Sequence, residues 1–230
     1  MAQKSEIIAS QSERQDFSRA ERQRFHTQSF LEIFVVFLLI VTAVWTPQGS
    51  LNAFFSISAA ACVLGFALAG TITRTWNSRE MGLTRPLAGT RNTLLIGVVL
   101  CVVIWLAGVT LRFSGSSYPI PWNRSWQYAI WALVQQFILQ SIFFLRFERA
   151  LGSRPAVVFS ATLYALAHVP NPVLAPLTFI GGLIFCELFR RYRNLFPLGI
   201  IHAALGLTIA ASFPNSWLHH MRVGIGYLTH

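Results

Sequence analysis

The sequence contains few charged residues. Asp, Glu, Lys and Arg make up 11% of its 230 residues, whereas soluble domains usually carry about 25%. So small a share cannot cover the surface of a water-exposed globule of this size, which disfavours a soluble enzyme. Hydrophobic residues reach 54% and the mean hydropathy is +0.53. These values predict an all-α, polytopic membrane protein.

Cysteine and acidic residues are also scarce. Cys62, Cys101 and Cys186 lie in apolar stretches and lack the spacing of a disulfide framework or a zinc knuckle. Eight acidic residues face 18 basic ones, for a net charge of +10. In a soluble protein this excess would suggest nucleic acid, but here the basic residues separate apolar stretches, as they do in cytoplasmic loops. The expected partner is therefore membrane lipid, with no nucleic acid.

Seven apolar stretches follow a polar N-terminal segment, and each approaches the length that crosses a hydrocarbon core of about 30 Å. We expect a cytoplasmic leader over 1–28, a transmembrane domain over 29–213 and an interfacial tail over 214–230. Only residues 169–172, with two prolines, separate the fifth stretch from the sixth, so these two could be short spans or one broken hairpin. The stretches are 29–46, 51–72, 92–111, 127–145, 155–171, 173–189 and 197–213.

The distribution of basic residues predicts the orientation. With seven crossings and the N-terminus inside, 15 of the 18 basic residues fall in inner segments, and only Arg112, Arg124 and Arg222 fall outside. The positive-inside rule expects this asymmetry. The sequence thus predicts an N-in, C-out protein of the cell membrane.

Polar side chains occur in three predicted spans, where they are costly to bury. Several of them are four residues apart and therefore share a helix face. Each needs a hydrogen-bond partner, and convergence on one site is the simplest solution, although simple interhelical contacts are the alternative. The residues are Gln135, Gln136 and Gln140 in the fourth span, Tyr164 and His168 in the fifth, and His202 with Gly206 in the seventh.

The order and spacing of these residues resemble the CAAX-protease and bacteriocin-processing (CPBP) intramembrane endopeptidases. That family carries Glu-Glu-x-x-x-Arg on one helix, Phe-x-x-x-His on the next and a later His-x-x-x-Asn-type motif. The corresponding segments here are QQFILQ (135–140), YALAH (164–168) and HAALG (202–206). Met-Gly-Leu at 81–83 is similar to a Leu-Gly-Leu turn of such proteins, and the resemblance covers about 80–211.

The resemblance implies a membrane peptidase that cleaves hydrophobic or lipidated peptides. In the family, the glutamates are understood to activate a water molecule, while the histidines and asparagine bind the oxyanion or help to hold a metal. Carried over, it implies catalytic roles for Gln135, Gln136, Gln140, His168 and His202, and substrate contacts for Tyr164, Asn171 and Gly206. The resemblance also implies that His168 and His202 could hold a divalent metal such as zinc as a cofactor. Asn171 could equally be a turn residue.

The glutamines are the main departure from the family pattern. An amide cannot take a proton from water as a carboxylate can, and Gln140 stands where the family has arginine. Within the spans, only Glu32 and Glu187 are acidic; both lie near the inner ends, and Glu187 is expected to pair with Arg190 or Arg191. A catalytic chain would need His168 or His202 as base, or a histidine-held metal, for which two histidines are a poor ligand set.

Three functions are therefore left open. The first is an endopeptidase, and the second is a catalytically impaired relative that binds a hydrophobic peptide or lipidated tail as a maturation factor. The third is a haem protein with His168 and His202 as axial ligands, which is disfavoured because the predicted depths of the two residues differ by about 12 Å.

Overall fold

A computed structural model describes residues 26–73, 75–110 and 121–229, and this part of the chain contains helices but no strands. Each of the seven predicted apolar stretches is helical over most of its described length, which confirms the all-α fold. Most of the leader predicted for 1–28 lies outside the described residues. The long helices are His26–Trp45, α2 (Ser50–Ile72), α3 (Thr90–Thr110), α4 (Trp122–Phe137), α6 (Ser153–Leu166), α7 (Leu174–Tyr192) and α8 (Phe196–Ser212).

Two element boundaries differ from the prediction. The fourth helix does not end at 145, because α4 continues through the π-helical segment η1 (Ile138–Phe144) into α5 (Leu145–Leu151). The fifth helix stops at Leu166, so His168 lies in the turn that follows and not inside a span. Pro170 explains this early end, since residues that precede proline leave the helical region.

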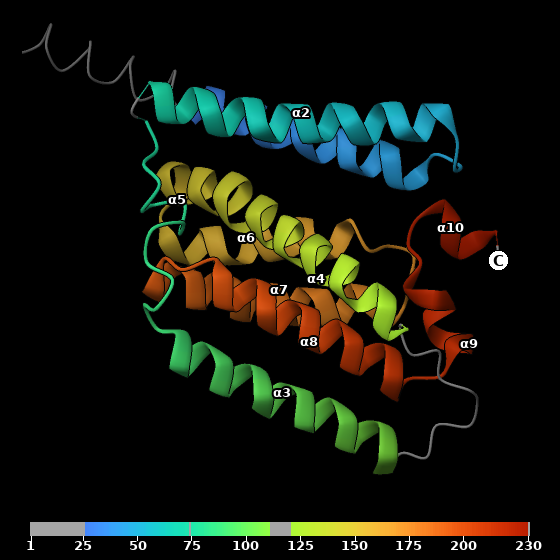
Figure 1. The fold of residues 1–230 in the computed structure, drawn as a ribbon. Coiled ribbons are helices and arrows are strands. Elements are labelled where there is room, and N and C mark those ends of the chain that lie inside the picture. Colours follow the sequence, from blue (N-terminus) through green and yellow to red (C-terminus); the bar gives the residue numbers. More distant parts are fainter. Residues whose placement is uncertain (1–25, 74, 111–120, 230) are drawn as a thin grey trace, which may run out of the picture.

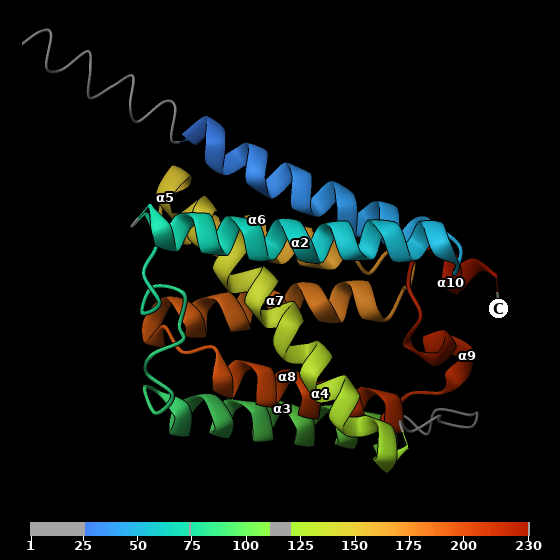
Figure 2. The same ribbon diagram turned by 45° about the horizontal axis from the view of Figure 1, so that its top comes forward.

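By length and apolar composition, four helices among the described residues are able to cross a membrane: His26–Trp45, α2, α3 and the continuous rod Trp122–Leu151. The rod of 30 residues is about 45 Å long at 1.5 Å per residue, which exceeds the hydrocarbon core and requires tilt. Figure 2 shows α4 crossing α7 and α8 obliquely.

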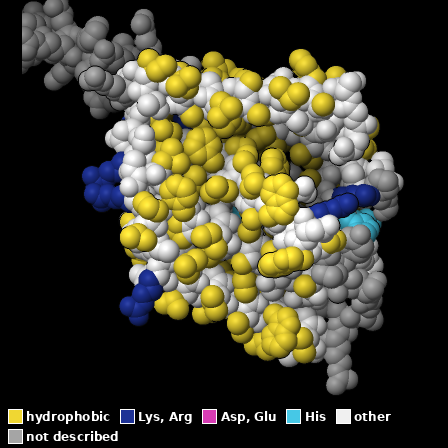
Figure 3. All heavy atoms as spheres, in the orientation of Figure 1, with side chains coloured by type: hydrophobic (Ala, Val, Ile, Leu, Met, Phe, Trp, Pro, Cys, Tyr) yellow, Lys and Arg dark blue, Asp and Glu magenta, His cyan; other side chains and the backbone are white. Residues whose placement is uncertain are grey.

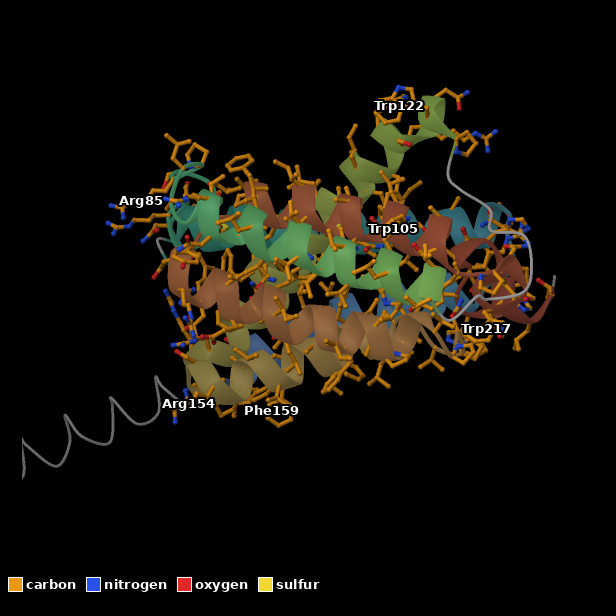
Figure 4. The ribbon with its side chains drawn as sticks, turned by 90° about the horizontal axis from the view of Figure 1, so that it is seen from below. Arg85, Trp105, Trp122, Arg154, Phe159 and Trp217 are labelled. Carbon is orange, nitrogen blue, oxygen red and sulfur yellow. The ribbon has the colours of Figure 1, made fainter. Side chains whose placement is uncertain are left out.

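Successive helices run in opposite directions, so the connections alternate between two ends of the bundle (Figure 1). The closest packing is of α6 on α7, and of α8 on both α3 and α4. Arg85 and Arg154 lie at one end and Trp122 and Trp217 at the other (Figure 4). These two arginines and these two tryptophans thus lie at opposite ends of the bundle.

The outer helices expose apolar side chains along their length. Leu64 of α2 is 67% exposed and Val98 of α3 is 61% exposed. Figure 3 shows hydrophobic side chains spread over this whole face, with basic ones mainly at its edge. Water would penalise so large an apolar surface, and a bilayer removes that penalty. The fold is that of an integral membrane protein.

The π-helical segment η1 is the centre of the bundle. Six of its seven residues are buried, including Gln140 and Ser141, because it contacts α2, α6 and α7 besides its own rod. A π-helical turn shifts the backbone hydrogen-bond pattern and leaves carbonyl groups that need other donors. Ser141 is held from outside the rod, since its Oγ donates to the backbone oxygen of Met81 at 3.2 Å.

A buried ion pair supplies further donors. Arg146 is 1% exposed, and its Nη1 donates to the carbonyl oxygen of Ser141 at 2.8 Å, while its Nε donates to Glu32 of the N-terminal helix. The positive-inside count places Arg146 in an inner segment; in the structure the helix continues past 145, and Arg146 is buried within the bundle. The pair joins the first helix to the central rod.

Loss of one partner of this pair should destabilise the protein strongly. Arg146→Ala would leave the partly buried carboxylate of Glu32, 15% exposed, without its cation; loss of one partner of a buried pair costs about 3–5 kcal/mol, so thermal unfolding in detergent should show a clear fall in Tm. Replacing both partners by apolar residues, Glu32→Leu with Arg146→Met, should recover most of the loss. Arg191→Ala is the control, since Arg191 is 60% exposed and Tm should barely change.

Candidate functional site: a buried polar network

Polar side chains from α4, η1, α6 and α8 meet inside the bundle. Gln136 and Gln140 are fully buried, and His202 is 8% exposed. The 3.6-residue period places Gln136 above Gln140 on one face of the rod. The convergence that the sequence predicted for these spans is therefore present in the structure.

One continuous series of hydrogen bonds links five side chains. The Nε2 of Gln140 donates to the Oε1 of Gln136 at 3.2 Å, and the Nε2 of Gln136 lies 3.3 Å from the Nδ1 of His202. The Nε2 of His202 lies 3.0 Å from the phenol oxygen of Tyr164, which donates to the Oε1 of Gln135 at 3.2 Å. Every bond in the series can therefore run in one direction, from Gln140 to Gln135.

This direction fixes the state of His202. With the amide of Gln136 as the donor to Nδ1, that ring nitrogen carries the lone pair; the backbone of Ala132 is a further hydrogen-bonding neighbour of the ring. The phenol proton of Tyr164 is given to Gln135, so the phenol oxygen accepts from the other ring nitrogen. His202 is accordingly neutral and protonated on Nε2, an assignment that follows from the hydrogen-bond pattern. Neither of its nitrogens is left for a substrate.

His168 has the opposite tautomer. Its Nδ1 lies 2.7 Å from the backbone oxygen of Tyr164, and a carbonyl only accepts, so Nδ1 must carry the proton. The lone pair is then on Nε2, for which no described residue supplies a donor. The two rings pack edge to face, with the His168 centroid 4.9 Å from that of Tyr164. His168 is half-buried and lines a cavity.

The cavity beside the network has a volume of about 370 Å³ and a mainly aliphatic and aromatic wall. Gln135, Tyr164, His168 and His202 all reach it, and no Asp or Glu is among its described lining residues. The polar groups are therefore confined to one part of an apolar chamber. Such a chamber suits a ligand with one polar bond within an apolar segment.

Gly206 allows α4 and α8 to approach closely. A Cβ at this position would overlap the phenol of Tyr128, and both residues line the cavity. Gly206 therefore lies at the cavity, as the resemblance implied. Its lack of a side chain leaves room for the phenol of Tyr128, and it offers no polar side-chain group. Tyr128 was missed by the sequence analysis, because it precedes the motif and no spacing marks it.

Asn171 has a different role from the implied substrate contact. Its Oδ1 accepts from the backbone N–H groups of Val173 and Leu174 at the start of α7, at 3.1 and 2.9 Å. Its Nδ2 donates to the carbonyl oxygens of Leu218 and Arg222 in the C-terminal tail. Asn171 is fully buried, and all its polar atoms are used, so it is a helix cap and a tail anchor.

The acidic residues of the spans lie outside the network. Glu187 is paired with Arg190 at 2.8 Å and with Arg191 at 2.6 Å, which confirms the expected pairing. Glu32 is bound to Arg146. Both carboxylates are thus committed to cations away from the cavity, and neither can replace the family's glutamates.

The donor set does not fit zinc. A catalytic zinc usually has three protein ligands, and within the described part of the chain no three His, Cys, Asp or Glu side chains form such a group. Both nitrogens of His202 already have partners, Gln136 and Tyr164. The same two bonds oppose axial ligation of haem. The metal and haem possibilities therefore have no support in this geometry.

Fold and site together define an all-helical membrane protein with a polar network beside an apolar cavity. The model of the Type II CAAX prenyl endopeptidase Rce1-like family matches residues 118–208, the stretch that contains every candidate site residue. This match confirms, over these residues, the resemblance to the CPBP intramembrane endopeptidases. No curated protein and no solved structure matches the chain.

The two tautomers can be tested directly. With ¹⁵N-labelled histidine, NMR at neutral pH should show His202 neutral with its proton on Nε2 and His168 neutral with its proton on Nδ1. Tyr164→Phe should move the Nε2 signal of His202, because it removes the acceptor of that proton. Identical tautomers for the two residues, or an imidazolium at His202, would contradict a series of hydrogen bonds that runs from Gln140 to Gln135.

Proposed function

We propose that this chain is an intramembrane endopeptidase that cleaves an apolar or lipidated peptide, with His168 as its general base. One observation carries the proposal: the Nε2 of His168 is the ring nitrogen left free at the cavity, while both nitrogens of His202 are engaged. A neutral imidazole with a free lone pair is the ordinary general base at neutral pH.

In the first step, the Nε2 of His168 takes a proton from a water molecule as the water oxygen bonds to the peptide carbonyl carbon. The resulting imidazolium keeps its Nδ1–H bonded to the backbone oxygen of Tyr164, which orients the ring. This bond has the role that a carboxylate has in a catalytic triad, although a neutral carbonyl stabilises the imidazolium less.

In the second step, the C–N bond breaks and the His168 imidazolium returns its proton to the leaving amine. The amide nitrogen of Gln135 is suited to stabilise the oxyanion formed in between. Its Oε1 accepts from Tyr164, which orients the side chain at the cavity wall, and no described residue accepts from its Nε2. A donor that is already oriented stabilises the developing charge without reorganisation.

The shape of the apolar space supports a hydrophobic substrate. A larger hollow of about 1190 Å³ lies between the N-terminal hairpin and α4, and it shares six lining residues with the cavity. Figure 3 shows this hollow below α2, bordered by hydrophobic side chains. An apolar chain could extend from the hollow while its scissile bond lies beside His168. The shared residues are Ile40, Val44, Trp131, Ile138, Met221 and Val223.

The proposal includes the seven crossings with the N-terminus inside. The basic end of the bundle, which carries Arg85 and Arg154, then faces the cytoplasm, and the turn with His168 lies towards the outer surface. Helices α6, α7 and α8 would cross within the shell formed by the longer helices. Labelling of engineered cysteines in the 85 and 217 regions of intact cells would test this orientation.

His168 and Gln135 give separate kinetic predictions. With a quenched peptide ending in a farnesylated Cys-aliphatic-aliphatic-X sequence, His168→Ala should lower kcat by at least about 10²-fold. Gln135→Ala should lower kcat by about 10²–10³-fold with little change in KM. His26→Ala, at the start of the N-terminal helix, is the control and should cleave normally. Equal activity of the wild type and the His168 variant would refute the assignment.

A second candidate is the catalytically impaired relative that binds its peptide without cleaving it. The observation that favours it is the replacement of every family carboxylate by an amide, in a cavity whose described lining has no Asp or Glu. In a binding-only protein, the hydrogen-bonded network would only determine the shape of the cavity.

Restoring the charged residues of the family motif distinguishes the endopeptidase from the binding-only relative. If the chain is a binding factor, the wild type should bind peptides without turnover, and Gln136→Glu with Gln140→Arg should introduce cleavage. If His168 is the base, the wild type already turns over substrate and His168→Ala abolishes it. Turnover by the unmodified chain excludes the binding-only function.

A further inference from the structure

The C-terminal tail returns to the cavity instead of leaving the bundle. After α8, the short elements α9 (Asn215–Leu218), η2 (His219–Met221) and α10 (Ile225–Leu228) fold over the end at which α6 and α7 are joined (Figure 1). Met221 and Val223 line the cavity, and the same two residues also line the larger hollow. These two residues of the tail thus form part of the wall between the cavity and the larger hollow.

Asn171 anchors the tail three residues from His168. Its Nδ2 donates to the carbonyl oxygens of Leu218 at 3.0 Å and Arg222 at 3.1 Å, on either side of Met221. The backbone N–H of Gly224 adds a bond to the oxygen of Val169 at 3.0 Å. The turn that carries His168 and the tail are therefore joined by three hydrogen bonds.

The tail backbone is held in an unfavourable conformation. His219, His220 and Met221 have positive φ values of 46°, 55° and 57°, a region that non-glycine residues seldom adopt and that persists only where the surroundings impose it. Gly224 also has a positive φ, and a Cβ there would overlap the backbone oxygen of Val44 in the N-terminal helix. Release of the anchors would therefore let this segment relax away from the cavity.

We infer that residues 213–229 form a strap that controls access to His168, with Asn171 as its anchor and Met221 as the side chain that it inserts at the cavity wall. The anchor consists of a few local hydrogen bonds and the strap's backbone is strained; its buried apolar contacts are a small cluster around Leu218, against which Met221 and Val223 pack. These two features make opening of the strap inexpensive compared with unfolding of the bundle. The strap is defined by geometry alone and would restrict entry whether the chain cleaves or only binds its ligand, so it goes beyond the proposed function.

The test measures access to His168 without any substrate. Diethyl pyrocarbonate acylates an imidazole nitrogen that carries a free lone pair, and mass spectrometry of the digested protein reports each histidine separately. In Asn171→Ser, the serine hydroxyl can still accept at the start of α7, since serine is as good a cap as asparagine, but it cannot supply two donors to the tail. The variant is uncharged, so it does not alter the electrostatics at His168.

The labelling rate of His168 should rise about tenfold in Asn171→Ser, because loss of the two tail bonds shifts opening by about 1.4 kcal/mol. Met221→Ala should also raise the rate, since it removes the side chain at the wall. Leu228→Ala is the matched control: Leu228 belongs to the same tail, is 60% exposed and lines neither space. Its rate should equal that of the wild type.

An unchanged His168 rate in both Asn171→Ser and Met221→Ala, with Tm close to that of the wild type, would overturn the strap. A rise in Leu228→Ala equal to that in Met221→Ala would also overturn it, because access would then depend on general loosening of the tail. Neither outcome depends on proteolysis, so failure of the strap and failure of the peptidase proposal are distinguishable.

Discussion

Polar side chains inside an apolar bundle must satisfy one another, and this requirement organises the centre of the protein. Gln140, Gln136, His202, Tyr164 and Gln135 meet it with four hydrogen bonds that can all run in the same direction. Because each residue comes from a helix with its own packing, the series fixes the relative depth of α4, α6 and α8. It also uses both nitrogens of His202, so the proposed chemistry at the cavity involves the Nε2 of His168, for which no described residue supplies a donor. The network thus satisfies most of its polar atoms internally, and the buried Oε1 of Gln140 is left without a hydrogen-bond partner among the described residues.

The network depends in turn on the π-helical segment that carries Gln140. A π-helical turn exposes backbone carbonyls, and in this protein the guanidinium of Arg146 satisfies those of Ser141 and Ile142. The charge of that guanidinium is balanced by Glu32 from the first helix. The buried pair contributes little net stability once desolvation is included, but it couples the N-terminal helix to the rod that bears the site. The hollow under the N-terminal hairpin therefore opens beside the cavity that contains His168.

The end of the cavity is closed by a segment with different physical properties. The walls formed by α4, α6, α7 and α8 are packed helices, whereas the tail is held by a few hydrogen bonds and has three consecutive left-handed residues. Cooperative opening is easiest where buried apolar contacts are few. The turn of His168 and the anchor Asn171 are also adjacent in sequence. The nitrogen proposed as the general base and the proposed anchor of the tail therefore belong to residues only three positions apart.

Composition and hydropathy alone determined that the chain is an all-helical membrane protein, and helical spacing correctly grouped Gln136 with Gln140. These features are local, because each depends on residues within one turn of one helix. Burial of Arg146, the end of α6 before His168 and the anchoring role of Asn171 were decided only by tertiary structure. Sequence periodicity states which side chains share a face but not which partner from another helix meets them. The direction of a hydrogen bond, and hence the free nitrogen of a histidine, depends on distances between atoms that are far apart in the chain.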